Sequence, residues 1–300
     1  MEQDGGLRQK NFNPDHCSPS SDITDGSCLD RKLLIQVSKA LNKICKDNKI
    51  DCTTDTPQLH ENICKCMHKM TGCSSESCWL NFKKLLKKLG KNKEKFINSF
   101  KPIMPEEWLT DYNSWLTTDD IENCLIQYEN AKKEFYFYGA VPIDFSKCHV
   151  SNLCRFNLKK HIQQGHKKIG IVFNTDPHTE DGEHWISMYV DINGQNLKGI
   201  PGIYYFDSYG LKPCKEVNYL IKKIKKQGKL VNKQFKYFYN DKNYQKRDAQ
   251  CGMYSIHFIK EMLKGLSFDN FLDSGLSDKK MIQKRNLYFI EPSKIKKIKM

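Results

Sequence analysis

Four residues in the second half of the chain have the side chains that acyl transfer requires. In chain order they are His184, Asp207, Gln245 and Cys251. A thiol attacks a carbonyl carbon well only as the thiolate, so Cys251 needs a base, and histidine titrates in a suitable pH range. An acidic partner such as Asp207 would orient the imidazole and stabilise its charged form. The Gln245 amide and the Cys251 backbone N–H would donate to the oxyanion that forms on attack.

The flanking sequence predicts the elements that hold these residues. Residues 183–191 alternate around an apolar stripe and predict a strand with His184 at its start. A second short strand over 203–206 ends at Asp207. Two further strands are predicted at 168–174 and 235–239, and the four would form a mixed sheet.

Cys251 is expected at the N-terminus of a largely buried helix. Residues 252–263 carry apolar side chains at helical spacing, and Gly265 is a suitable stop. The positive end of a helix dipole stabilises a thiolate, so this position favours a reactive cysteine. Gln250 directly precedes the nucleophile, but it lacks the six-residue offset of Gln245.

Together these motifs resemble a known family. His-Trp, then Phe-Asp-Ser, then Gln-x5-Cys-Gly is similar to the signature of the SUMO-specific cysteine proteases and of adenain, the adenovirus protease. Within this group the chain is most similar to the asfarvirus branch that cleaves core polyproteins. That branch has asparagine at the third catalytic position, whereas Asp207 matches the SUMO proteases. The likeness lies in residues 170–176, 182–191 and 244–259, and more weakly in 72–78.

The resemblance implies a fold, a reaction and a biological role. The expected fold is α+β, a papain-like variant of the SUMO-protease/adenain type with a mixed sheet, a central Cys-bearing helix and a small helical N-terminal domain. The expected activity is a cysteine endopeptidase without cofactor that cleaves after small residues, at Gly-Gly-Xaa sites, to mature viral structural or core polyproteins. It would act as a monomer in the host cytoplasm, at virus assembly sites, and in the virion.

Three other functions remain open at this point. A SUMO or ubiquitin-like deconjugase would use the same chemistry on a folded protein substrate, and Asp207 favours it slightly. A non-enzymatic basic binding protein could keep the fold as a relic, although the complete set of four residues argues against it. An acetyltransferase built on the same triad is a more distant alternative.

Three further residues are candidates for substrate binding. Trp185 is expected beside the active-site cleft, although simple core packing also explains it. Asn174 precedes the histidine strand by a short loop and could reach the site. Trp115 begins a Trp-Leu segment that resembles the start of the SUMO-protease catalytic domain, where this segment lines the substrate channel.

The chain is predicted to divide into three parts: a poorly ordered segment 1–27, a helical domain 28–104, and a catalytic domain 105–300. In the helical domain, Asp30 would cap a helix over 31–46, and a second apolar stripe ends at Gly90. Both stripes are expected to pack against the catalytic domain. In the catalytic domain, Asp119 would cap a helix that carries Ile121, Leu125 and Tyr128.

Composition favours an intracellular enzyme with an acidic partner. The 300 residues carry a formal net charge of +14, and 13 cysteines occur without a signal peptide or an apolar run of membrane-spanning length. Reduced thiols in the cytosol are the simplest account of that cysteine count. A basic surface that would contact nucleic acid or an acidic polyprotein consists of Lys83, Lys84, Lys87 and Lys88. Four cysteines that could bind zinc are predicted to be reduced structural residues instead: Cys64, Cys66, Cys73 and Cys78. A basic tail carries Lys294, Lys296, Lys297 and Lys299.

Overall fold

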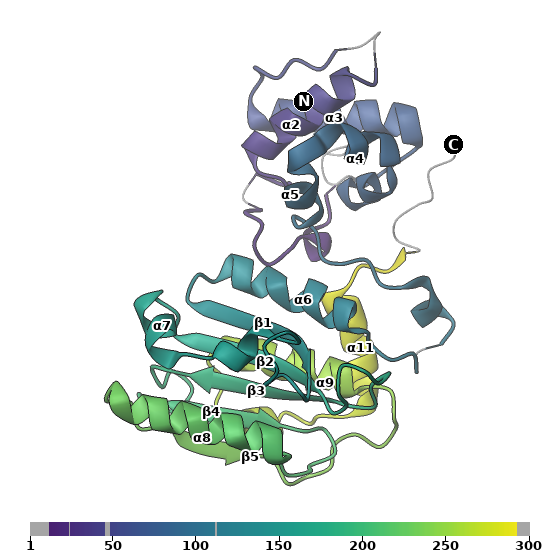
Figure 1. Ribbon diagram of the computed structural model, residues 1–300. Helices are drawn as coiled ribbons and strands as arrows, with labels where there is room; N and C mark the ends of the chain where they lie inside the picture. Colours follow the sequence, from purple (N-terminus) through teal and green to yellow (C-terminus); the bar gives the residue numbers. More distant parts are fainter. Residues whose placement is uncertain (1–11, 24, 46–48, 112, 293–300) are drawn as a thin grey trace. The chain divides into compact units, whose positions relative to one another are not determined.

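The protein divides into two compact units, seen in a computed structural model that describes residues 12–23, 25–45, 49–111 and 113–292 (Figure 1). The first unit comprises Met1–Glu106 with Asn286–Met300, and the second comprises Glu107–Arg285. The boundary lies next to the predicted one, but the end of the chain belongs to the first unit. There Met104 N donates to Ile290 O, and Ile290 N donates to Pro102 O. The predicted lysine-rich tail lies outside the described residues.

The first unit is helical. Its elements are η1 (Pro14–His16), α2 (Arg31–Asn42), α3 (Thr56–Thr71), η2 (Glu76–Asn81), α4 (Lys83–Leu89), η3 (Gly90–Asn92) and α5 (Lys93–Ile97). Asp30 caps α2 as predicted, because its Oδ1 accepts from Leu33 N at 2.7 Å. The helix ends at Asn42 rather than at residue 46, because the Asn42 side chain turns back to bond both backbone groups of Ile50.

The apolar stripes of α2 and α4 pack against each other and against α3, so the first unit has a core of its own. Its buried residues include Leu34, Val37, Leu41, Leu59, Ile63, Met67, Leu85 and Leu89. The prediction that both stripes pack against the catalytic domain is therefore wrong. The missing partner was α3, whose cysteines and histidines interrupt the apolar pattern that would have indicated a helix.

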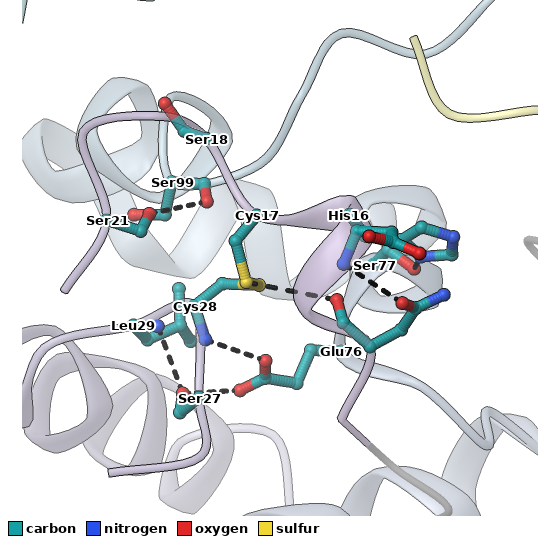
Figure 2. Close-up of a disulfide and its surroundings, with 12 residues drawn as sticks. His16, Cys17, Ser18, Ser21, Ser27, Cys28, Leu29, Glu76, Ser77 and Ser99 are labelled. Carbon is teal, nitrogen blue, oxygen red and sulfur yellow. Dashed lines mark hydrogen bonds between the residues drawn. A yellow bond between two sulfur atoms is a disulfide. The ribbon is translucent and has the colours of Figure 1, made fainter. Parts of the chain in front are cut away.

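The described part of residues 1–27 is ordered, contrary to the prediction for that segment. Cys17 forms a disulfide with Cys28 (Figure 2). The buried carboxylate of Glu76 accepts from Ser27 Oγ at 2.5 Å and from Cys28 N at 2.9 Å, and it pairs with His60 Nε2 at 2.9 Å. A covalent bond and a satisfied buried carboxylate thus anchor a segment with few large apolar side chains.

The prediction of reduced cysteines is wrong for six of them. Besides Cys17–Cys28, disulfides join Cys73 to Cys78 and Cys148 to Cys154. The Cys73–Cys78 bond removes two thiolates from the cluster considered as a zinc site. Cys64 and Cys66 are free thiols.

The second unit is built on a five-stranded mixed sheet with strand order β1-β2-β3-β4-β5. Its elements are η4 (Glu106–Leu109), α6 (Thr118–Ala131), β1 (Phe135–Pro142), η5 (Asn152–Arg155), α7 (Leu158–Gln163), β2 (Lys168–Asn174), β3 (Trp185–Asp191), β4 (Gly202–Phe206), α8 (Lys215–Leu230), β5 (Lys236–Tyr239), α9 (Cys251–Leu263), α10 (Phe268–Leu272) and α11 (Asp278–Tyr288), whose last residues belong to the first unit. The central pairs β2–β3 and β3–β4 are antiparallel, and the outer pairs β1–β2 and β4–β5 are parallel.

The α+β fold with a mixed sheet is confirmed, and the four predicted strands are present. The fifth strand, β1, was not predicted. Its sequence is apolar or aromatic throughout, and a bulge between Phe137 and Ala140 breaks the period-two pattern that marks a strand. The helix α6 is capped by Thr117, in a capping box with Asp120, rather than by Asp119.

Helices cover both faces of the sheet. On one face, apolar residues of α7 and α8 join the odd-numbered core positions of β2. On the other face, α9 packs against β3 and β2, and α6 packs against β1 and α9. Gly170 in β2 allows α9 to approach, because a Cβ there would lie 3.3 Å from Ile259 and 2.8 Å from the Phe135 ring.

The turn between β3 and β4 also holds the far end of α9. Asn196 Nδ2 donates to Met262 O and Leu266 O, each at 2.8 Å. The turn itself is held by Asp191, whose carboxylate accepts three backbone N–H groups. Within the residues that the structure describes, no helix has the length and apolar character needed to span a membrane.

Candidate active site

The antiparallel pairing of β3 and β4 brings His184 and Asp207 together. His184 directly precedes β3 and Asp207 directly follows β4, and Ser187 pairs with Phe206 in the register between them. Both side chains therefore lie at the same edge of the sheet. His184 Nε2 donates to Asp207 Oδ1 at 2.8 Å, and the two side chains are 11% and 3% exposed.

Cys251 completes this group from the other layer of the fold. It is the first residue of α9, it is buried, and its thiol forms a hydrogen bond with the His184 imidazole. Because Nε2 bonds Asp207, the thiol must use the other ring nitrogen, Nδ1. Burial lowers the pKa of His184, but the hydrogen bonds and negative charges of Asp207 and Cys251 outweigh burial and raise this pKa to about 9. The site therefore favours a protonated imidazole between Asp207 and Cys251.

Asp207 is held by backbone and amide groups that leave its carboxylate aimed at the imidazole. Tyr209 N donates to Asp207 Oδ1 at 2.8 Å. Asn240 accepts from Asp207 N at 3.0 Å and donates to Asp207 O at 2.6 Å. Asn240 was not predicted from the sequence. It directly follows β5, which runs parallel to β4, so the pairing of these strands was the signal that could have placed it beside Asp207.

Gln245 is tied to the same turn. Its backbone N–H donates to Ser208 O at 3.0 Å, and its Oε1 accepts from Ser208 Oγ at 2.7 Å. Its Nε2 donates to the Tyr209 hydroxyl at 3.2 Å. Gln250 instead accepts from Arg285 Nη2 at 3.4 Å. Gln245 is thus hydrogen-bonded to the turn that follows Asp207, and its role as an oxyanion donor stays a prediction.

Trp185 is fixed between α9 and the segment before α6. Its Nε1 donates to Leu116 O at 2.9 Å, and Ser255 Oγ donates to its carbonyl at 3.4 Å. Gly252 permits this packing, because a Cβ there would lie 2.9 Å from Leu116 Cβ. Trp115, beside Leu116, is 43% exposed.

Asn174 makes local contacts at the end of β2. Its Oδ1 accepts from Asp176 N at 2.9 Å, and its amide would lie 2.2 Å from a Cβ at Gly182. These contacts shape the loop between β2 and β3. The roles of Asn174, Trp115 and Trp185 in substrate binding stay predictions.

Known proteins share this sequence and fold. Residues 154–296 match the Ulp1 protease family, C-terminal catalytic domain. A provisionally named thiol protease of Acanthamoeba polyphaga mimivirus is 31% identical over 302 residues, which cover 95% of this chain and 96% of the relative. An African swine fever virus protein named SUMO-1 cysteine protease is 25% identical over 185 residues, covering 61% of this chain and 63% of that protein.

The crystal structure of the African swine fever virus protease has the same fold. It matches with a TM-score of 0.64 at 22% identity, over 94% of this chain and 98% of that chain. The relationship over nearly the full length supports a cysteine peptidase rather than the non-enzymatic binding protein or the acetyltransferase considered above. This chain belongs to the Ulp1 family of cysteine peptidases, thiol proteases that act on protein substrates.

Proposed function

We propose that Cys251 is the nucleophile of this peptidase, His184 its base, Asp207 the orienting acid and Gln245 the side-chain donor of the oxyanion hole. One observation carries this assignment. A single, mostly covered imidazole, 11% exposed, bonds Asp207 at 2.8 Å and the Cys251 thiol, and that thiol lies at the start of α9. Six other cysteines are outside the disulfides, at positions 45, 52, 64, 66, 124 and 214.

The reaction follows from this arrangement. The Cys251 thiolate attacks the scissile carbonyl, and the oxyanion is stabilised by Gln245 Nε2 and the Cys251 backbone N–H. His184, present as the imidazolium, protonates the leaving amine, and a thioester remains on Cys251. The neutral imidazole then takes a proton from the water that attacks the thioester, and cleavage of the C–S bond releases the acid product and restores the Cys251 thiolate beside the imidazolium.

Replacement of the nucleophile tests the assignment. Cys251→Ala should abolish peptide cleavage and covalent labelling by a peptidyl vinyl sulfone. Cys214→Ala is the matched control, because Cys214 is a free, exposed thiol in the same unit. Labelling and cleavage that persist in Cys251→Ala and disappear in another cysteine variant would refute the assignment.

For the substrate, we propose viral structural or core polyproteins, cleaved after small residues at Gly-Gly-Xaa sites. The support is the resemblance to the asfarvirus branch and the two viral relatives. The corresponding setting is the host cytoplasm, at assembly sites, and the virion, with the enzyme as a monomer. Mapping of cleaved bonds in infected-cell lysate, with wild type against Cys251→Ala, should give Gly-Gly at the cleaved side. Cleavage after other residues would contradict this specificity.

The basic face of α4 is proposed to bind an acidic polyprotein. All four of its lysines, Lys83, Lys84, Lys87 and Lys88, are exposed. Added salt should slow cleavage of the polyprotein more than cleavage of a short peptide, because salt screens exposed charges. Replacing the four lysines by glutamine should remove this difference. Equal salt sensitivity in the wild type would refute the proposal, and stimulation of peptide cleavage by DNA would point to nucleic acid as the partner.

A SUMO or ubiquitin-like deconjugase is the second candidate. The acidic third residue, Asp207, favours it, as does the name of the African swine fever virus relative. Cleavage of SUMO and ubiquitin fusions should be compared with cleavage of Gly-Gly-Xaa peptides of matched sequence. A kcat/KM that is orders of magnitude higher on a fusion than on its peptide would establish recognition of the folded modifier, and so a deconjugase.

A further inference from the structure

Tyr209 contacts three residues of the proposed site and, next to them, Asp248. Its ring stacks on the His184 ring, with centroids 4.7 Å apart and an interplanar angle of 29°. Its backbone N–H donates to Asp207 Oδ1 at 2.8 Å. Its hydroxyl accepts from Gln245 Nε2 at 3.2 Å and donates to Asp248 Oδ1 at 3.1 Å. The register of β3 and β4, continued past the strand ends, places Tyr209 opposite His184.

We infer that Tyr209 is a positioning residue with two separable actions: its hydroxyl orients the oxyanion-hole amide of Gln245, and its ring stabilises the imidazolium of His184. The inference rests on the proposed roles of His184, Gln245 and Cys251. Tyr209 itself contacts neither the scissile bond nor the attacking sulfur in this scheme.

The hydroxyl fixes the amide in one orientation. Ser208 Oγ donates to Gln245 Oε1 at 2.7 Å, so the amide oxygen faces Ser208. On the other side the Tyr209 oxygen accepts one Nε2 hydrogen, because its own proton is directed to Asp248. The second Nε2 hydrogen is then the one left for an oxyanion. Burial, followed by the hydrogen bond and charge of Asp248, raises the pKa of Tyr209 to about 12, so the phenol stays neutral at working pH.

The ring acts on the charge of the histidine. The face of an aromatic ring is electronegative and attracts a cation held against it. The charged groups that face His184 are Asp207, at the end of β4, and Cys251, at the start of α9. Tyr209 adds an uncharged wall that favours the imidazolium and excludes water from one face of the ring.

Two substitutions separate these actions. Tyr209→Phe keeps the ring and removes the hydroxyl, so kcat should fall by about 5- to 10-fold, the worth of one hydrogen bond, with KM unchanged. The rate at which iodoacetamide alkylates Cys251, and its pH dependence, should stay as in wild type. Tyr209→Leu should add a second effect: the alkaline limb of the rate–pH profile should move down by about half to one pH unit, because the cation loses its aromatic neighbour. Tyr219→Phe, at an exposed tyrosine of α8, is the control.

A double-mutant cycle with Gln245→Ala decides whether the hydroxyl acts through the amide. Tyr209→Phe should cost nothing further in the Gln245→Ala background, and Asp248→Ala should reproduce part of the Tyr209→Phe loss while Asp248→Asn restores it. If Tyr209→Phe lowered kcat by the same factor in the wild-type and Gln245→Ala backgrounds, the inference for the hydroxyl would be overturned. If Tyr209→Leu left the rate–pH profile unchanged, the inference for the ring would be overturned. If Cys251→Ala remained active, the proposed function would fail instead, which is a separate result.

Discussion

Replacing Asp207 by asparagine should separate the charge of this residue from its geometry. Asparagine can still accept the hydrogen bond from His184 Nε2 and the one from Tyr209 N. It cannot supply the negative charge. We therefore expect the variant to keep substantial activity near neutral pH, as the asparagine of the asfarvirus branch also implies.

The size of the effect follows from the pKa of His184. Asp207 and Cys251 together raise this pKa from 6.5 to about 9 despite burial. Loss of one adjacent charge typically changes a pKa by about 1 to 2 units, so the variant's imidazolium should lose its proton near pH 7 to 8. At 1.36 kcal/mol per unit, this corresponds to about 1–3 kcal/mol of interaction.

Two assays measure the change in the pKa of His184. The alkaline limb of the kcat/KM–pH profile should move from about pH 9 in wild type to lower pH in Asp207→Asn. Stability gives an independent measure. The folded pKa lies above the unfolded one, so this stabilisation is complete below about pH 6.5 and is lost as the pH rises through about 9. Asp207→Asn should therefore lower the free energy of unfolding in urea at pH 6 by about 1–3 kcal/mol, and by much less at pH 9.5.

An alkaline limb that moves upward in Asp207→Asn would refute the direct charge interaction between Asp207 and His184. An equal decrease in the free energy of unfolding at pH 6 and pH 9.5 would also refute it. A decrease that does not change between these pH values cannot come from the interaction of Asp207 with the imidazolium, because the imidazolium loses its proton within that range.

Three further predictions concern the nucleophile, the oxyanion hole and the first unit. Cys251→Ser should fold with an unchanged melting temperature and lose nearly all peptidase activity, since a hydroxyl does not ionise beside this base; a serine variant of comparable activity would contradict the thiolate mechanism. Gln245→Ala should lower kcat by roughly 10²–10³ with little change in KM, whereas Gln250→Ala, whose amide bonds Arg285, should lower it much less; the reverse order would move the oxyanion hole to Gln250. Cys17→Ser with Cys28→Ser should destabilise the first unit by about 2–3 kcal/mol, given the short loop that the bond closes, and calorimetry that shows no change would exclude a stabilising role for this disulfide.

The sequence predicted the second unit well because its chemistry and its strand pattern coincide. His184, Asp207 and Cys251 each lie at the end of an element with clear periodicity, and the ends of those elements meet at one edge of the sheet. Tyr209 and Asn240 could not be placed from local pattern. Their contacts depend on which strands are neighbours and in what register, and that is a tertiary property.

The first unit was predicted less well, for two physical reasons. Its third helix, α3, mixes buried Ile63 and Met67 with cysteine and histidine, so its periodicity is weak. Disulfide pairing depends on which cysteines the fold brings within bonding distance, and spacing along the chain does not determine it. The 13 cysteines therefore predict reduced thiols, whereas the structure joins six of them in three disulfides.

The turn between β3 and β4 has a consequence for how the enzyme loses activity. The hairpin meets α9 at both ends: His184 bonds Cys251 at the start of the helix, and Asn196 bonds Met262 O and Leu266 O at its end. Neither the hairpin nor the helix can open alone without breaking contacts at both places. Amide hydrogen exchange in β3 and α9 should therefore occur only through global opening of the second unit, and thermal inactivation should follow the same transition.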